Sequence, residues 1–227
     1  GMESWRQSLA LEPSAVNHRN LGKALWKRQG KLEEGRAQYE RAIALAPGDH
    51  RLYVDLCDIM TDLCVAPAEK LSLLQSAPHH GRIDARLAAV LVEMKAWDEA
   101  IAVLQNMQFD PYEGERGTRP AYYEAYLGRA EQRHHHGDLA GALRDLEQAM
   151  QYPRNVGVGK SYFAQDARAC YWAGVVADEM GDSDKARRYY EEGAAIRPWP
   201  QQDPASPREG YHPEARYYKG LCLQKLG

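Results

Sequence analysis

The segment PRNVGVGK at residues 153–160 contains the motif G-x-G-K, which could bind a phosphate group. A nucleotide-binding loop of this type has a further glycine upstream and lies between a strand and a helix. Here the segment follows a helical pattern, and the upstream glycine is absent. We interpret its glycines as residues of a tight connection that needs positive φ angles. Asn155 and Lys160 are then candidates for contacts with a partner surface, although Asn155 could instead bond the local backbone.

A second polar segment, FDPYEGERG at residues 109–117, carries the neighbouring carboxylates Glu113 and Glu115. Paired carboxylates perform acid–base chemistry at glycosidic bonds when their separation is fixed. Nothing in the sequence fixes that separation, and exposed loop glutamates are usually only hydrated. We therefore favour a binding role for Glu113, with Tyr112 as an aromatic anchor and Arg116 as a guanidinium donor.

The histidines and cysteines lack the spacing of a metal site. His134–His136 are consecutive and point in different directions on a helix, whereas paired helical ligands are four residues apart. We expect them to be cations beside a helix C-terminus. Four cysteines without C-x-x-C spacing predict free, buried thiols: Cys57, Cys64, Cys170 and Cys222. No metal, other cofactor or catalytic residue is predicted.

The composition is that of a protein with a hydrophobic core. Hydrophobic residues make up 44% of the 227 residues and charged residues 27%, which argues against disorder. A net charge of −3 gives no strong field toward nucleic acid or anionic lipid. No apolar run approaches the roughly 20 residues that a membrane span needs. Neither nucleic acid nor membrane is expected as a partner. The compartment stays open, and the unpaired cysteines favour the cytoplasm.

The elements that position these residues are paired helices, seen most clearly at residues 167–198. This stretch contains two amphipathic helical patterns joined at a glycine–aspartate turn. Its small and aromatic residues are separated by 7, 5, 4, 3 and 5 positions: Gly174, Gly181, Ala186, Tyr190, Gly193 and Pro198. This spacing resembles the tetratricopeptide repeat, in which small residues stand where two helices cross closely. We expect Gly174 and Ala186 to allow that approach and Tyr190 to fill the space toward the next pair.

Similar spacing recurs along the chain and predicts an all-α fold. We expect a right-handed tetratricopeptide superhelix, or α-solenoid, as a single domain over residues 1–227 with enlarged inter-repeat loops. Its repeats are expected at 15–47, 50–78, 83–111, 121–153 and 167–198, with half repeats at 2–13 and 213–227. The half repeats suggest a segment excised from a longer protein.

The first helices of such repeats line a groove, which is the usual binding surface. Counting from Gly174 and Gly22 places five residues toward this groove or at its edge: Arg19, Lys23, Trp26, Arg168 and Tyr171. Aromatic and basic side chains together would suit peptide C-termini, acidic segments or sugars, and the sequence does not choose among these ligands.

Four irregular segments carry a closer resemblance. HRNLGKALW at 18–26, PAEKLSLLQ at 67–75, FDPYEGERG at 109–117 and YPRNVGVGK at 152–160 occur in an order that resembles the C-terminal repeat region of a bacterial family of large proteins. In that family, a galactose-mutarotase-like β-sandwich domain of unknown function precedes the repeats. The family usually has Trp at the position of Tyr112 and Leu at that of Val156. The resemblance implies a carbohydrate-related parent protein.

These observations favour a non-catalytic scaffold that binds a protein or peptide through its groove and loops. The resemblance makes the parent's own N-terminal β-sandwich domain one expected partner. An alternative from another class is an accessory domain that completes the site of a carbohydrate-processing enzyme. Homodimerisation through the ends of the array is a third possibility, because uncapped repeats expose apolar faces.

Overall fold

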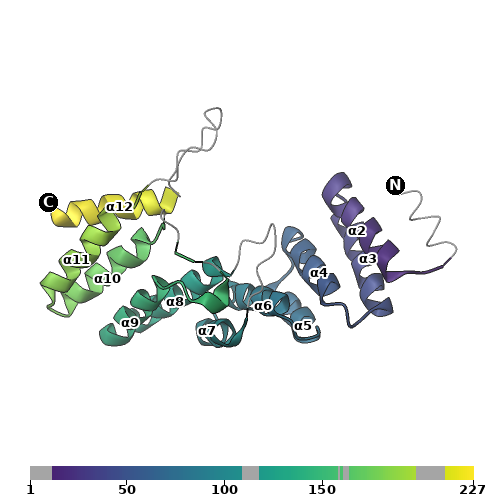
Figure 1. The fold of residues 1–227 in the computed structure, drawn as a ribbon, viewed down its shortest axis with the longest axis horizontal. Helices are drawn as coiled ribbons and strands as arrows, with labels where there is room; N and C mark the ends of the chain where they lie inside the picture. The colour runs from purple at the N-terminus through teal and green to yellow at the C-terminus, as the bar shows by residue number, and fades with distance from the viewer. Residues whose placement is uncertain (1–11, 109–117, 158, 161–163, 198–212) are drawn as a thin grey trace, which may run out of the picture. The chain divides into compact units, whose positions relative to one another are not determined.

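The computed structural model describes residues 12–108, 118–157, 159–160, 164–197 and 213–227 (Figure 1). In these ranges the chain forms eleven α-helices and one short 3₁₀ helix, and no strand. The all-α prediction is therefore confirmed for the described residues. The chain divides into two compact units, Gly1–Glu115 (unit 1) and Arg116–Gly227 (unit 2).

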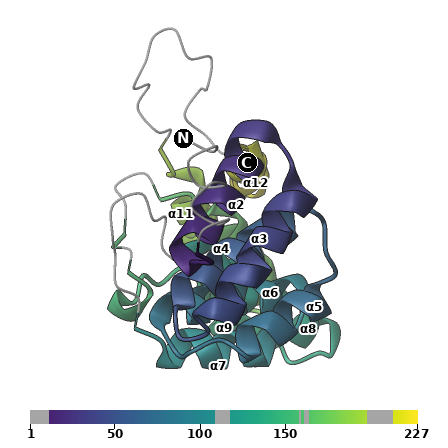
Figure 2. The same ribbon diagram turned by 90° about the vertical axis from the view of Figure 1, so that its right-hand side faces the viewer.

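The described part of unit 1 consists of six helices: α2 (Ala15–Gln29), α3 (Leu32–Leu45), α4 (His50–Asp62), α5 (Pro67–Gln75), α6 (Gly81–Glu93) and α7 (Trp97–Asn106). Each helix packs on the next along the chain, and α6 also packs on α4. Figures 1 and 2 show α2 and α3 lying side by side. The helix α6 begins before the predicted start of its repeat at residue 83, because the His80 side chain accepts a hydrogen bond from the Arg82 amide and caps it.

Close helix approach in unit 1 depends on two glycines that face each other. A Cβ atom on Gly22 of α2 would lie 3.1 Å from the carbonyl oxygen of Gly35 on α3. The core beside this crossing contains Trp26, Tyr39 and Ile59, all buried. The sequence pattern therefore places small residues where the backbones meet and large ones between the pairs.

The described part of unit 2 forms five α-helices and the 3₁₀ helix: α8 (Arg119–His135), α9 (Leu139–Ala149), η1 (Arg154–Val156), α10 (Ala167–Glu179), α11 (Ser183–Ala194) and α12 (Pro213–Leu226). The pairs are α8 with α9 and α10 with α11, and α12 packs on both α10 and α11. The helices α8, α10 and α12 are each the first helix of a repeat, and these three repeats follow one another in the chain.

The packing roles predicted for the 167–198 stretch are confirmed. A Cβ atom on Gly174 would overlap the ring of Tyr190, so only glycine allows this approach of α10 and α11. Tyr190 is 3% exposed and packs with Cys222 of α12, which places its ring toward the next helix. Its hydroxyl donates a hydrogen bond to Asp178 at 2.9 Å. Gly181 forms the turn between the helices with φ of 81°.

The prediction that all four cysteines are buried is wrong for one of them. Cys57, Cys170 and Cys222 are buried and free, but Cys64 is exposed. Cys64 follows α4 in a turn with φ of 55°, where the helix ends and its side chain leaves the core. Burial raises the pKa of Cys57 and of Cys222 to about 11, so both stay protonated at neutral pH.

None of the helices in the described ranges combines the length and the apolar character needed to cross a membrane.

Candidate functional site

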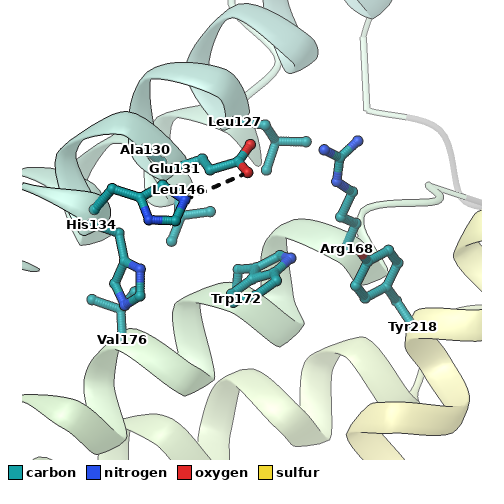
Figure 3. Close-up of a pocket in the computed structure, with 10 residues that line it drawn as sticks. Leu127, Ala130, Glu131, His134, Leu146, Arg168, Trp172, Val176 and Tyr218 are labelled. Atoms are coloured by element: carbon teal, nitrogen blue, oxygen red, sulfur yellow. Dashed lines mark ion pairs between the residues drawn. The ribbon is translucent and has the colours of Figure 1, made fainter.

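A pocket of about 290 Å³ opens in unit 2 between the first helices α8, α10 and α12, with one contribution from α9 (Figure 3). We call it the Trp172 pocket. It is lined by Leu127, Ala130, Glu131, His134, His135, Leu146, Arg168, Trp172, Val176 and Tyr218.

The floor of the Trp172 pocket is apolar and fully packed. Leu127 and Ala130 come from α8, Leu146 from α9 and Val176 from α10, and each is at most 4% exposed. The lining residues of α8 and α10 recur every three or four positions, so they share one face of each helix. The same helix contacts that form the core of unit 2 therefore hold the pocket floor in place.

Trp172 lies at the centre of this arrangement (Figure 3). Its side chain is 38% exposed although it stands in the middle of α10. Its ring lies 6.4 Å from the ring of His134 and 5.5 Å from that of Tyr171, centroid to centroid. A half-exposed indole over an apolar floor can contact a ligand with a large surface at little entropic cost.

The polar rim of the pocket begins with Arg168. Its Nη1 atom lies 3.2 Å from Oε2 of Glu124 on α8 and 3.0 Å from Oε1 of Glu214 on α12. Burial alone would lower the pKa of Arg168, but the two carboxylates outweigh it and raise the pKa above its ordinary value. Arg168 is therefore charged, and two glutamates already share that charge.

His134 and His135 form the opposite part of the rim. The Nε2 atom of His134 lies 2.7 Å from Oε2 of Glu179 on α10. The Nε2 atom of His135 lies 3.9 Å from Oε1 of Glu131, one turn earlier on α8. The helix ends at His135 as predicted, but His134 lines the pocket and contacts a neighbouring helix. Among the described residues, no group of three or more His, Cys, Asp or Glu side chains is placed to hold a metal ion.

The other groove residue predicted in unit 2, Tyr171, is half-buried beside the pocket. Its ring lies 5.6 Å from that of Tyr218 and 6.2 Å from that of Tyr190, centroid to centroid. Tyr171 therefore packs behind Trp172 and supports the pocket wall.

The three predicted groove residues of unit 1 differ in their surroundings. Arg19 pairs with Asp55 of α4, Nη2 to Oδ2, at 2.8 Å. Lys23 is exposed on α2. Trp26 is 8% exposed and packs in the core, where its Nε1–H donates to Asp62 at 2.6 Å.

The predicted loop residues lie in part outside the described residues. This applies to Tyr112, Glu113 and Arg116, whose roles stay predictions. Asn155 lies in η1, and Lys160 is exposed with its Nζ 3.8 Å from Oε1 of Glu192 on α11. The loop residues and the groove residues of unit 1 do not line the Trp172 pocket, whereas Arg168 does.

Sequence reasoning missed Trp172 and the pocket role of His134. A signal for Trp172 was present, because it stands four residues after Arg168 and four before Val176, on one face of α10. The three histidines were interpreted by their position at a helix end, and the contact of His134 with Glu179 joins residues 45 positions apart.

The packing and the pocket define an all-helical repeat protein with the tetratricopeptide-repeat fold. Residues 167–198, which contain α10 and α11, match the family model described as tetratricopeptide repeat. A comparison with curated proteins found no match.

Solved structures with this fold resemble most of the chain. YrrB, described as a TPR protein with an unusual peptide-binding site, has 18% identity and a TM-score of 0.57, covering 85% of this chain and 91% of YrrB. MamA has 14% identity and a TM-score of 0.53, covering 78% of this chain and 88% of MamA. PilF of Pseudomonas aeruginosa has 15% identity and a TM-score of 0.51, covering 98% of this chain and 87% of PilF. These likenesses confirm the predicted fold; the closer family with a β-sandwich domain stays a prediction.

Proposed function

We propose that this chain is a non-catalytic scaffold that binds a polypeptide segment at the Trp172 pocket. The observation that carries the proposal is the half-exposed indole of Trp172 above a buried apolar floor. Binding surfaces use large aromatic anchors of this kind. The peptide-binding site reported for YrrB, a protein with the same fold, supports the proposal by analogy.

The size and polarity of the pocket favour a side chain of a partner over a reacting substrate. A volume of about 290 Å³ accommodates one or two large side chains. The polar groups around it are paired with one another, Arg168 with glutamates and His134 with Glu179, and so hold the pocket shape.

No comparison supports the carbohydrate alternative, and the carboxylates considered for it, Glu113 and Glu115, lie outside the described residues. The β-sandwich domain of the parent stays a predicted partner, and binding between the separately produced domain and this chain tests it. Homodimerisation also stays a prediction, which sedimentation at two concentrations tests.

Selection of a displayed random peptide library on the whole chain tests the proposed function. We expect binders that are lost, with more than tenfold weaker binding, when Trp172→Ala replaces the anchor. The matched control is Trp97→Ala, which removes a half-buried tryptophan from unit 1 and leaves the pocket residues unchanged. Circular dichroism establishes that both variants are folded. If no selected peptide distinguishes Trp172→Ala from the control, the pocket is not the binding site.

A further inference from the structure

The rim of the Trp172 pocket carries an excess of negative charge. Four glutamates line it or pair with its lining residues: Glu131, Glu179, Glu124 and Glu214. Among the described residues that line the pocket, Arg168 is the one with a permanent positive charge. Four carboxylates and one guanidinium have three formal negative charges in sum, with the two histidines left out of the count.

The other arginines at the C-terminal end of α8 do not offset this charge. Arg129 Nη2 lies 2.8 Å from Oδ1 of Asp145, and Arg133 Nη1 lies 2.8 Å from Oδ2 of the same carboxylate. Asp145 is 2% exposed on α9, and both guanidinium groups are paired with its carboxylate. Neither arginine lines the Trp172 pocket.

We infer that the segment bound at the Trp172 pocket is basic as well as apolar. A bulky apolar side chain would rest on the floor, and neighbouring Lys or Arg side chains would meet the rim glutamates. The inference rests on the proposed function and specifies its ligand by charge complementarity. Trp172 and Tyr218 add aromatic faces on which a cation is also stabilised.

The same geometry disfavours the acidic segments that the sequence left open. An acidic peptide or a C-terminal carboxylate needs a cation with bonding capacity to spare, whereas Arg168 contacts two glutamates at 3.2 and 3.0 Å. Such a ligand would have to displace one glutamate and would leave its charge uncompensated beside the pocket.

The test uses the peptides selected on the whole chain and lost with Trp172→Ala. We expect these pocket-dependent peptides to be enriched in Lys and Arg and depleted in Asp and Glu relative to the unselected library. A synthetic copy of the strongest binder is then titrated by fluorescence anisotropy. Its affinity should fall several-fold between 50 mM and 500 mM salt, because ions screen the exposed rim charges.

Charge-removing variants separate rim electrostatics from general effects. The double variant Glu131→Gln with Glu179→Gln should weaken binding of the synthetic peptide about three- to tenfold, because each exposed ion pair changes the affinity by a few-fold. Gln at position 179 keeps a hydrogen-bond acceptor for His134. The matched control is Glu191→Gln on α11, an exposed glutamate that pairs with Arg187 and does not line the pocket. We expect no change in that control.

The possible outcomes are distinguishable. Pocket-dependent binders that are basic, salt-sensitive and weakened by the double variant support the inference. Pocket-dependent binders that are neutral or acidic overturn it and leave the proposed function intact. A selection without pocket-dependent binders overturns both.

Discussion

Two glycines, one in α10 and one in α12, occupy equivalent positions of the repeat pattern but have different surroundings. Gly174 and Gly220 each precede by seven residues a glycine with positive φ, Gly181 and Gly227. A Cβ atom on Gly174 would overlap the ring of buried Tyr190, whereas one on Gly220 would meet nothing within 4 Å. The cost of a methyl group therefore depends on packing and not on the repeat pattern.

Alanine at these two positions should have opposite effects on stability. Gly174→Ala should lower the free energy of unfolding by about 1–3 kcal/mol, because the closely packed ring has no space to move. Gly220→Ala should raise it by about 0.5–1 kcal/mol, because alanine favours an exposed helix interior. Urea unfolding of both variants measures the difference. Equal effects would show that the close contact between α10 and α11 does not determine the cost of the added methyl group.

At the scale of residues, the sequence predicted where a side chain lies better than it predicted which residues that side chain contacts. Counting from Gly174 placed Arg168 toward the predicted groove, and in the structure it lines the Trp172 pocket. Its partners Glu124 and Glu214 are 44 and 46 residues away, and no local pattern indicates such pairs. The prediction of an available basic group therefore overlooked that the charge is shared.

At the scale of single helices, the beginning of α4 shows how one side chain sets an element boundary. Asp49 is its N-cap and accepts a hydrogen bond from the Arg51 amide at 3.0 Å. The same carboxylate accepts two more from the Arg51 guanidinium, at 2.8 and 2.7 Å. Hydrogen bonds from Arg51 hold the pKa of Asp49 below its ordinary value, against the opposing effect of burial.

Replacing Asp49 should therefore have a pH-dependent cost. Asp49→Ala should lower the free energy of unfolding by about 1 kcal/mol at pH 7, through loss of the cap. Asp49→Asn keeps the cap and loses only the charge, so its deficit should be smaller, about 0.5 kcal/mol for an exposed pair.

The sign of the pH effect follows from the lowered pKa. The charge of Asp49 stabilises the fold above the unfolded-state pKa near about 3.9 and ceases to do so as the pH falls through the lower folded-state value. Wild type and Asp49→Asn should thus differ at pH 5–7 and converge below about pH 4 in urea titrations. A difference that persists in acid would mean that it does not come from the charge of Asp49.

Helices as elements were predictable, and the site that they form was not. The periodic small residues at 174, 181, 186 and 193 mark crossings between neighbours in the chain, so they identify α10 and α11 directly. The Trp172 pocket instead requires faces of α8, α10 and α12 to meet. That meeting depends on how consecutive helix pairs stack, and the stacking is determined by contacts between residues that are distant in the sequence.

At the scale of the molecule, the helices of each unit pack mainly on their neighbours in the chain. In unit 2, α10 packs on α9, α11 and α12, and in unit 1, α4 packs on α3, α5 and α6. Stability in such an array is close to a sum of local terms and neighbour interfaces. A defect is therefore expected to spread to adjacent helices and weaken with distance along the chain.

Hydrogen exchange in Gly174→Ala tests this expectation. We expect faster exchange of backbone amides in α9, α10, α11 and α12, because these helices share interfaces with the strained crossing. Amides of α2 and α3 should exchange at wild-type rates in the same sample. Uniform acceleration along the chain would instead show that both units unfold as one cooperative body.

Arg168 connects carboxylates on the helices before and after its own, Glu124 on α8 and Glu214 on α12. One guanidinium thereby links three successive first helices on the face that carries the pocket. Loss of this bridge would lower the bending stiffness of unit 2, and a bound cation that competed for either carboxylate would have the same effect. Arg168 thus takes part both in the contacts between these helices and in the lining of the pocket.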